Sequence, residues 1–507
     1  MADKIKIIDT FFGGNTRDDK STVTGAVSNA EEVDIFTNKN YVQAEQIMTA
    51  DALPDASELY SFCVSDADVV YGYGKETGAN KVRIFNVNDG GGSNPGAWAT
   101  LFTSSDATDL AISTSPIAYH KTSETGNHFL YYIAGASATW KLVRYNITTP
   151  GEADVGTLTG LTGSYDRPTM RRFFGELFIT HGQYIAKVDD DGTFTEKAWT
   201  LPNSQIAIDI IPVSDVAIVL ARNTNRYINE TTGYWWDLES SAQFDDQFKI
   251  PMGGGQWIAS WKERIIIFCA INGIGKFYQL SGAYPGAQPL EIPDRLLLNV
   301  GTETTTQPIS SSKMVSQKDG VLYFGIYKTD KTGIYALGQI DSDAPIALVL
   351  AKRFLTTDYS GHKPTGLLIH GSNFYGAYDN SGALCSRCET QNSPARSSQG
   401  IIETIWHDYG TPLQKKDLTR AYINAYPLVA NTSLNLYIAS DFGTSYTQVK
   451  RPDDSVFNTT NGLLGLFRPS QFCKKFAFKA KISFTSSSTN SPKLQSIGLR
   501  CNIKDAE

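Results

Sequence analysis

Hydrophobic residues in the middle of this chain fall into short runs that come in pairs, separated by turn residues, as in the two strands of a β-hairpin. Runs rich in aromatic and β-branched residues recur about every fifty residues, at 68–74, 129–135, 176–182, 215–222, 264–272, 320–327 and 373–380. Second runs follow at 81–87, 140–147, 183–189, 275–282 and 332–340. A single β unit cannot bury both of its faces, so the pattern predicts a closed β-propeller of about seven blades.

The propeller is expected over residues 59–398, where helical periodicity is nearly absent and turn residues are dense. Gly- and Asp-rich turns separate the strands at 88–96, 189–192, 272–275, 317–320 and 379–382. Large indole rings fill the wedge between blades, so most tryptophans are expected in the core: Trp140, Trp235, Trp236, Trp257 and Trp261.

Residues 399–507 follow a different pattern, because apolar and polar residues alternate strictly in 433–441 and 476–484. Such alternation predicts half-buried strands with one wet face. In the second strand the buried face is expected to carry Phe476, Phe478, Ala480, Ile482 and Phe484. With the runs at 401–410, 418–428 and 494–503, this region is predicted to be an antiparallel β-sandwich. The fold class is therefore all-β, a propeller followed by a C-terminal sandwich.

Residues 1–58 stand apart as a leader containing a strand at 4–9 and a glycine turn at 11–15. Such a segment either wraps over a neighbouring domain or subunit, or supplies a peripheral strand that closes the last blade. Both alternatives remain open at the level of the sequence.

Composition narrows the class of protein. The 507 residues are 41% hydrophobic and only 19% charged, with 25 Tyr, 25 Phe and 43 Gly, which is typical of extracellular or virion β-proteins. A net charge of −7 argues against a protein that coats nucleic acid, although a passage that lets DNA slide past needs no strong positive charge. The N-terminus does not resemble a signal peptide and no apolar run is long enough to span a bilayer, so synthesis as a soluble cytoplasmic chain without membrane insertion is expected.

Acidic clusters offer little catalytic chemistry. The segment 441–446 resembles the Asp-box of sialidase-like propellers, with Asp441, Gly443, Ser445 and Tyr446 in place but Ala439 where that pattern has serine. Asp-boxes are hairpin turns, so a structural role is expected. Five other acids are candidates for glycoside cleavage or calcium binding, but they lie in turn-like clusters: Asp189, Asp190, Asp191, Asp245 and Asp246.

Metal and nucleophile motifs are equally sparse. Cys385 and Cys388 form a lone C-x-x-C without the second pair that a structural zinc site needs, and the six cysteines are too dispersed for a disulfide scaffold. The six histidines never occur at ligand spacing, and no nucleophile elbow or phosphate-binding loop is present. The sequence therefore predicts no catalytic residues, no metal site, no cofactor and no enzyme activity.

Lysines tilt the C-terminal region toward positive charge: Lys415, Lys416, Lys474, Lys475, Lys479, Lys481 and Lys504. They are interpreted first as a solvated strand face and, alternatively, as a positive surface at a subunit contact or lumen.

Two stretches, 255–282 and 476–503, carry a resemblance to a known family. The first runs from tryptophans through charged residues and an apolar strand to an aromatic strand ending in Ser-Gly, and the second ends in a strand of the form Ser-Pro-x-Leu-x-x-x-Gly. Together they are similar to the tail hub, or nozzle, proteins of short-tailed bacteriophages, most of all the enterobacterial type. The leader departs from that type, so its attachment role does not carry over.

The resemblance implies a structural virion protein, made in the host cytoplasm and built into the tail. Six copies would form a homo-oligomeric ring that contacts the portal-side adaptor and the tail fibres or spikes. Genomic DNA would pass through the lumen without specific binding. The alternative is a carbohydrate-binding or glycan-cleaving propeller, as in receptor-binding or sialidase-like proteins.

Overall fold

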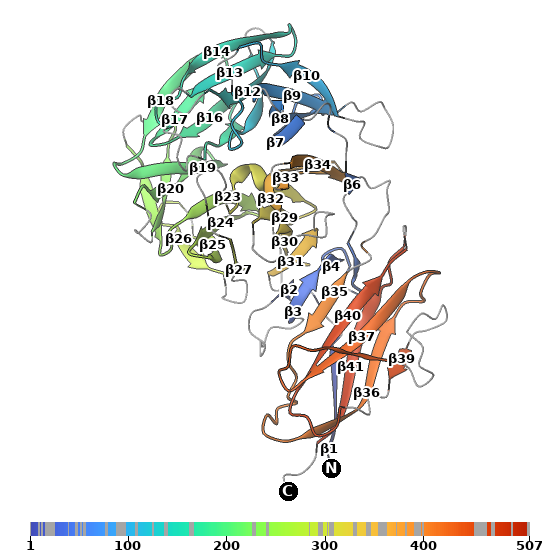
Figure 1. The fold of residues 1–507 in the computed structure, drawn as a ribbon. Coiled ribbons are helices and arrows are strands. Elements are labelled where there is room, and N and C mark those ends of the chain that lie inside the picture. Colours follow the sequence, from blue (N-terminus) through green and yellow to red (C-terminus); the bar gives the residue numbers. More distant parts are fainter. Residues whose placement is uncertain are drawn as a thin grey trace.

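A computed structural model shows an all-β chain in two lobes, a round upper lobe and an elongated C-terminal lobe at whose far end both termini lie (Figure 1). The structure describes residues 2–8, 11, 14–15, 26–38, 40–45, 49–50, 53, 57–76, 80–87, 98–106, 110–123, 126–135, 140–161, 167–225, 230–239, 243–282, 284–292, 298–301, 303, 309–327, 332–340, 346–352, 362–371, 373–380, 383–389, 397, 400–450, 464–467, 472–487 and 490–503.

The upper lobe is a seven-bladed β-propeller, as the spacing of the apolar runs predicts. Blades one to three are β7 (Ser57–Val64), β8 (Val70–Glu76), β9 (Val82–Val87) and β10 (Trp98–Thr103); β11 (Ile117–Lys121), β12 (His128–Ala134), β13 (Lys141–Asn146) and β14 (Gly151–Thr157); β15 (Met170–Phe173), β16 (Glu176–His181), β17 (Tyr184–Val188) and β18 (Phe194–Thr200). Each blade is an antiparallel meander.

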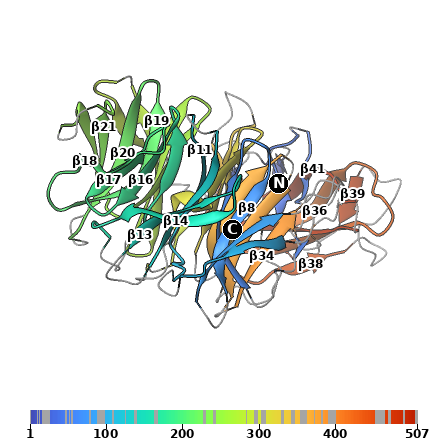
Figure 2. The same cartoon turned by 90° about the horizontal axis from the view of Figure 1, so that it is seen from above.

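Blades four to seven continue the circle, and Figure 2 shows the blades from above, with strands β36, β39 and β41 to one side. Their strands are β19 (Gln205–Val213), β20 (Val216–Asn223), β21 (Thr231–Trp236) and β22 (Asp246–Ile250); β23 (Gly255–Trp261), β24 (Arg264–Ile271), β25 (Ile274–Ser281) and β26 (Gln288–Glu291), with β27 (Leu298–Asn299) also on β25; β28 (Val315–Lys318), β29 (Val321–Ile326), β30 (Gly333–Gly338) and β31 (Ala347–Lys352); β32 (His362–His370), β33 (Asn373–Asn380) and β34 (Ala383–Glu389).

Packing between blades closes the circle. Each of the seven contacts between neighbouring blades holds its own apolar cluster, including the contact between blades seven and one. Between blades three and four, for example, Trp199 stacks on Trp236 with ring centroids 5.3 Å apart. The five tryptophans expected in the core are buried there: Trp140, Trp235, Trp236, Trp257 and Trp261. The radial arrangement of β units expected from the sequence is thus confirmed.

The N-terminal segment contributes short strands at three separate places. Strand β6 (Thr49–Ala50) pairs with β34 and so becomes the outermost strand of blade seven. Strand β3 (Ala26–Glu31) lies between β31 of blade six and β35 (Ile401–Thr404), and β2 (Gly14–Asn15) pairs with it. Strand β1 (Ala2–Ile8) pairs with β41 (Leu494–Ile503) at the other end of the molecule, while β4 (Val33–Asp34) and β5 (Gln43–Ala44) pair with each other.

The C-terminal lobe consists of two antiparallel sheets that share one apolar core. The first sheet has the order β1-β41-β36-β39, and the second continues from β3 as β35-β40-β37-β38. Their remaining strands are β36 (Lys416–Ala425), β37 (Ser433–Ser440), β38 (Thr447–Val449), β39 (Leu464–Phe467) and β40 (Phe478–Thr485). The core extends into blade six, whose Val321, Ala336 and Val349 belong to the same cluster.

Strand β40 alternates as the sequence predicts, with one correction. Phe478, Ala480, Ile482 and Phe484 are buried, but Phe476 is 37% exposed. The strand begins only at Phe478, after a residue with left-handed backbone, Lys474 at φ 60°. The alternation therefore does not extend back to Phe476.

Phe478 and Phe476 form a matched pair for testing this assignment. We expect Phe478→Ala to lower the free energy of unfolding by about 3–5 kcal/mol, because it leaves a cavity in the lobe's core. Phe476→Ala is expected to cost less than about 1 kcal/mol, since its ring already meets solvent. Urea unfolding followed by circular dichroism measures both changes, and equal losses would contradict the assignment.

Candidate functional site

Side chains from several blades meet near the axis of the propeller. The short 3-10 helix η2 (Ser312–Met314) begins blade six, and its Lys313 Nζ donates hydrogen bonds to the Tyr60 carbonyl at 3.2 Å and the Ser113 carbonyl at 2.6 Å. On the other side, Ser312 Oγ lies 2.7 Å from Thr169 Oγ1, just before blade three. These contacts join blades on opposite sides of the ring, so the axis is closed at this level.

Lys313 is partly buried, and its ammonium group meets two backbone carbonyls. Burial lowers the pKa of Lys313 to about 7, and the nearby Arg167 guanidinium lowers it further. Below neutral pH the protonated amine of Lys313 therefore lowers the stability of the folded protein, and hydrogen bonds to the two carbonyls offset this loss only in part.

Asp209 is a second charged residue inside the propeller, and it is fully buried on β19. Its carboxylate accepts hydrogen bonds from Arg171 at 3.3 Å, from the amide of Ile258 at 3.2 Å and from its neighbour Ile210 at 2.9 Å. Burial raises the pKa of Asp209, while Arg171 opposes that shift. With donors from three successive blades, this carboxylate acts as a cross-link between blades.

The acids singled out in the sequence lie at turns. Asp189 and Asp191 form the tip between β17 and β18, where the Asp191 carboxylate accepts the amide of Thr193 at 2.8 Å and Lys187 pairs with Asp189 at 2.7 Å. The Thr193 amide lowers the pKa of Asp191. Asp190 is exposed at the same tip.

Asp245 and Asp246 lie at the start of β22. Asp246 accepts the amide of Gly286 at 2.8 Å, and burial together with Asp237 raises the pKa of Asp245. Among the described residues, no three His, Cys, Asp or Glu side chains converge as metal ligands do.

The segment that resembles an Asp-box is a turn, but of a different kind from the one expected. The left-handed residues are Asp441 and Phe442, at φ 54° and 62°, rather than Gly443. The Asp441 carboxylate accepts the amide of Phe476 at 2.7 Å and pairs with Lys475 at 3.2 Å, so it holds the entry to β40. The turn leaves the Phe442 ring 56% exposed.

The remaining candidates are dispersed. Cys385 and Cys388 both lie on β34, and their side chains lie outside the described residues. Of the basic residues, Lys481 lies 3.8 Å from Glu403, and Lys416 is buried with three carbonyl acceptors. Lys504 lies outside the described residues.

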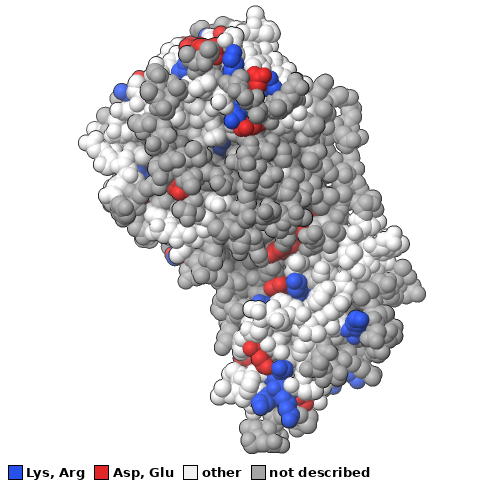
Figure 3. Space-filling view, viewed as in Figure 1, with Lys and Arg blue, Asp and Glu red and all other residues white. Residues whose placement is uncertain are grey.

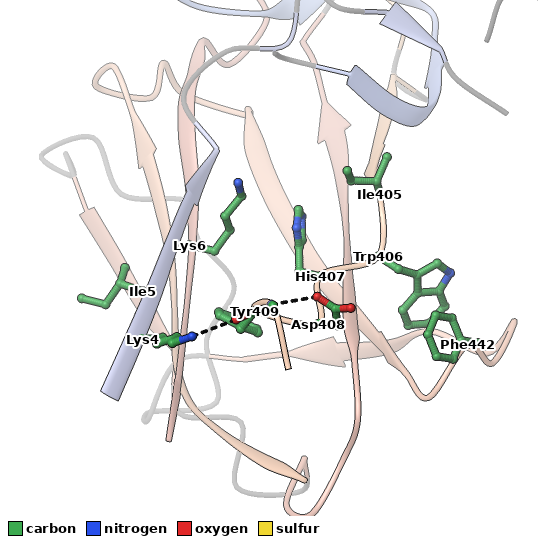
Figure 4. Close-up of a pocket in the computed structure, with 10 residues that line it drawn as sticks. Lys4, Ile5, Lys6, Ile405, Trp406, His407, Asp408, Tyr409 and Phe442 are labelled. Atoms are coloured by element: carbon green, nitrogen blue, oxygen red, sulfur yellow. Dashed lines mark hydrogen bonds between the residues drawn. The ribbon is translucent and has the colours of Figure 1, made fainter. Parts of the chain in front are cut away.

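A pocket of about 480 Å³ opens in the C-terminal lobe between β1 and the segment 405–410 (Figure 4). Lys4 and Lys6 line one wall, and the Lys4 ammonium donates to the Tyr409 carbonyl at 3.0 Å across the gap. Trp406 and Phe442 form an aromatic pair on the other side, with ring centroids 5.0 Å apart.

His407 lies between these walls and is only 8% exposed. Its Nε2 has no hydrogen-bond partner within the described part of the chain. Burial, with a contribution from Lys6, lowers the pKa of His407 to about 4, although Asp408 opposes the shift. The ring is therefore neutral at pH 7, and the pocket offers two ammonium groups, one carboxylate and an aromatic face.

Sequence reasoning did not find this pocket, because its walls are about 400 residues apart in the chain. A sign was nevertheless present in the first strand, where lysines alternate with isoleucines.

No protein-family model matches the chain, and no curated protein is similar to it in sequence. Among solved structures, it is similar to an exo-β-1,3-galactanase from Phanerochaete chrysosporium, with 9% identity, 90% of this chain and 100% of that chain covered, and a TM-score of 0.33. The propeller domain of the Trilobed protease from Pyrococcus furiosus has 11% identity, 65% and 94% coverage, and a TM-score of 0.39. A β-1,3-galactosidase solved with galactodeoxynojirimycin has 10% identity, 47% and 93% coverage, and a TM-score of 0.28.

These similarities concern the fold, an all-β propeller that glycoside hydrolases also use. They correct one expectation from the sequence: the statement that the chain is not an enzyme is wrong as an exclusion, because hydrolases are among the proteins of similar fold. None of the helical segments in the described part of the chain has the length and apolar character of a membrane-spanning helix.

Lys313 makes the stability of the propeller depend on pH. The pKa of Lys313 is about 7 in the folded protein and higher in the unfolded chain, so above pH 7 the unfolded chain binds more protons. Stability should therefore rise with pH, by at most about 1.4 kcal/mol per unit. We expect urea unfolding between about pH 7 and about pH 8.5 to show this slope in the native protein and a smaller one in Lys313→Met. Equal slopes would contradict the assignment.

Proposed function

We propose that this protein is a structural subunit of a virion tail, one copy of an oligomeric ring through which DNA leaves the particle. The observation that carries the proposal is the concentration of exposed apolar side chains on the smaller, C-terminal lobe. Among the residues that the structure describes, seven large apolar side chains are exposed there: Ile5, Ile7, Leu413, Tyr426, Val429, Phe442 and Phe476. Five described ones are exposed on the larger propeller: Phe174, Phe244, Ile274, Tyr284 and Leu290. Uncovered apolar side chains are typical of contact surfaces between subunits.

The connection between the lobes supports a role as a rigid part of the wall of a ring. One sheet runs from β28 in blade six through β3 to β38 in the C-terminal lobe. At the junction, the amide of Glu32 donates to the Leu350 carbonyl at 2.8 Å, and the amide of Glu45 donates to Glu32 at 2.8 Å. A wall element needs this kind of stiffness, because hinged lobes would not keep a channel open.

The closed axis bears on where DNA would pass. Lys313 and Ser312 bridge opposite blades, so no duplex fits along the axis of a single propeller at that level. In a ring of copies the passage would lie between the subunits, with each propeller as a solid part of the wall. A net charge of −7 is compatible with a lumen that does not retain DNA.

Lys479 and Lys481 provide a test of assembly. Both lie on the outward face of β40, opposite the buried Phe478 and Ile482. We expect Lys479→Glu with Lys481→Glu to leave the melting temperature nearly unchanged, because both side chains reach solvent, but to shift the multimer seen by native mass spectrometry to monomer.

The matched control is Lys197→Glu with Lys249→Glu on the outer strands of blades three and four. Lys197, like Lys481, lies over an aromatic ring, and Lys249 pairs with a glutamate. This control should keep the multimer. A native protein that is monomeric at micromolar concentration, with no rings in electron micrographs, would rule out the ring.

A second candidate, a carbohydrate-binding protein, is favoured by the pocket beside Trp406. An exposed aromatic pair next to groups that can hydrogen-bond is how many proteins hold a sugar ring, with the ring face on the apolar surface and the hydroxyls on the polar groups. We expect Trp406→Leu to weaken oligosaccharide binding by about tenfold, as measured by isothermal titration. Absence of binding to any of a panel of neutral and acidic oligosaccharides would eliminate this candidate.

A further inference from the structure

Lys4 and Lys6 are exposed, but they lie on the side of β1 that faces the core of the two packed sheets. In the register of β1 with β41, Lys4 lies opposite Cys501, Lys6 opposite Leu499 and Ile8 opposite Ile497. Residues directly opposite in an antiparallel pair share a face, and these three partners on β41 are buried in the core. The two lysines therefore occupy core-facing positions at the open end of the lobe, while Ile5 and Ile7 point to solvent.

Charge in the pocket is unbalanced toward the positive. Lys4 and Lys6 contribute two ammonium groups, His407 is neutral, and Asp408 contributes one carboxylate that accepts the amide of Gly410 at 2.9 Å. No ion pair or hydrogen bond holds Lys6 within the described part of the chain. Figure 3 shows lysine and arginine atoms gathered on this lobe toward the end that carries the termini. An anionic group entering the pocket would therefore meet an unpaired ammonium group.

The opposite wall of the pocket, formed by Trp406 and Phe442, has the aromatic surface on which a sugar ring can lie. Trp406 and Phe442 lie 5.0 Å apart between centroids, and the left-handed backbone of Phe442 is what presents its ring to solvent. Lys479 Nζ lies 5.8 Å from the Trp406 ring on the side of β40. The pocket volume, about 480 Å³, lies in the range of small-molecule sites.

We infer that this pocket binds a saccharide that carries an acidic group, such as a hexuronate, with the sugar face on the Trp406–Phe442 pair and the carboxylate at Lys6. His407 Nε2 can make a further hydrogen bond once a ligand enters, which would satisfy a buried group that has no partner among the described residues. The inference rests on the second candidate function and is independent of ring formation.

Lysines facing inward on an edge strand have another known role, which is to prevent a second chain from pairing with that edge. Strand β1 is at the edge of its sheet, so this role must be separated from ligand binding. The two roles differ in what Lys6→Met changes, which is either ligand affinity or self-association.

The test uses the full-length protein with a hexuronate disaccharide, its neutral hexose counterpart and a short polyglutamate peptide as probes, each measured by isothermal titration. We expect the uronate to bind about tenfold more tightly than the neutral sugar, and Lys6→Met to remove that preference. Lys249→Met, at a lysine whose side chain is 60% exposed on blade four, should leave it intact. Thermal melting checks folding, and Lys6→Gln serves if the methionine variant unfolds.

Four outcomes would overturn the inference. Equal affinity for neutral and acidic sugars would keep a carbohydrate site but remove the specificity for acid. Binding of none of the saccharides would remove both the specificity and the second candidate. Stronger binding of polyglutamate than of the uronate would assign the pocket to an acidic peptide. Unchanged uronate affinity in Lys6→Met, with new self-association, would assign the lysines to protection of the edge.

Discussion

A propeller blade has two apolar faces, and only a neighbour on each side removes both from water. The rest of this structure depends on that constraint. Seven inter-blade clusters satisfy it around the full circle, each dominated by aromatic and branched side chains. An open circle would leave two apolar blade faces exposed to water. Blades seven and one cover these faces where Trp98 packs on Tyr375, and this closing contact stabilises every other contact between blades.

Closure of the propeller also uses a strand from the N-terminal segment. Strand β6 completes blade seven before the chain begins blade one, which joins the two ends of the circle by backbone hydrogen bonds. The same segment also connects the two lobes. Strand β3 pairs with β31 of blade six and with β35 of the C-terminal lobe, and β1 pairs with β41. A segment of about fifty residues thus makes contacts in the propeller, at the junction and at the far end of the C-terminal lobe.

The sequence revealed the second and third strands of the blades but not the first and fourth, for a physical reason. After its first residue, His128, strand β12 is buried on both faces and consists of apolar and aromatic residues, so it stands out in the sequence. Strand β14, at the rim of the same blade, is mostly exposed and has the composition of a loop. The pairings of β1, β3 and β6 depend on contacts between residues hundreds of positions apart, and the pocket depends on β1, so neither follows from local pattern. Phe476 was misplaced because alternation continued past the point where the strand begins.

The role as a wall element rests on the N-terminal strands, which join the two lobes into one stiff body. Native-state hydrogen exchange at the junction tests it most directly. The amide of Glu32 donates to the Leu350 carbonyl on β31, and the amide of Glu45 donates to the Glu32 carbonyl between β3 and β4. Both should exchange as slowly as the amides of the buried strand β12. Exchange of these amides as fast as that of the exposed strand β14 would mean that the lobes move separately, and the account would be wrong.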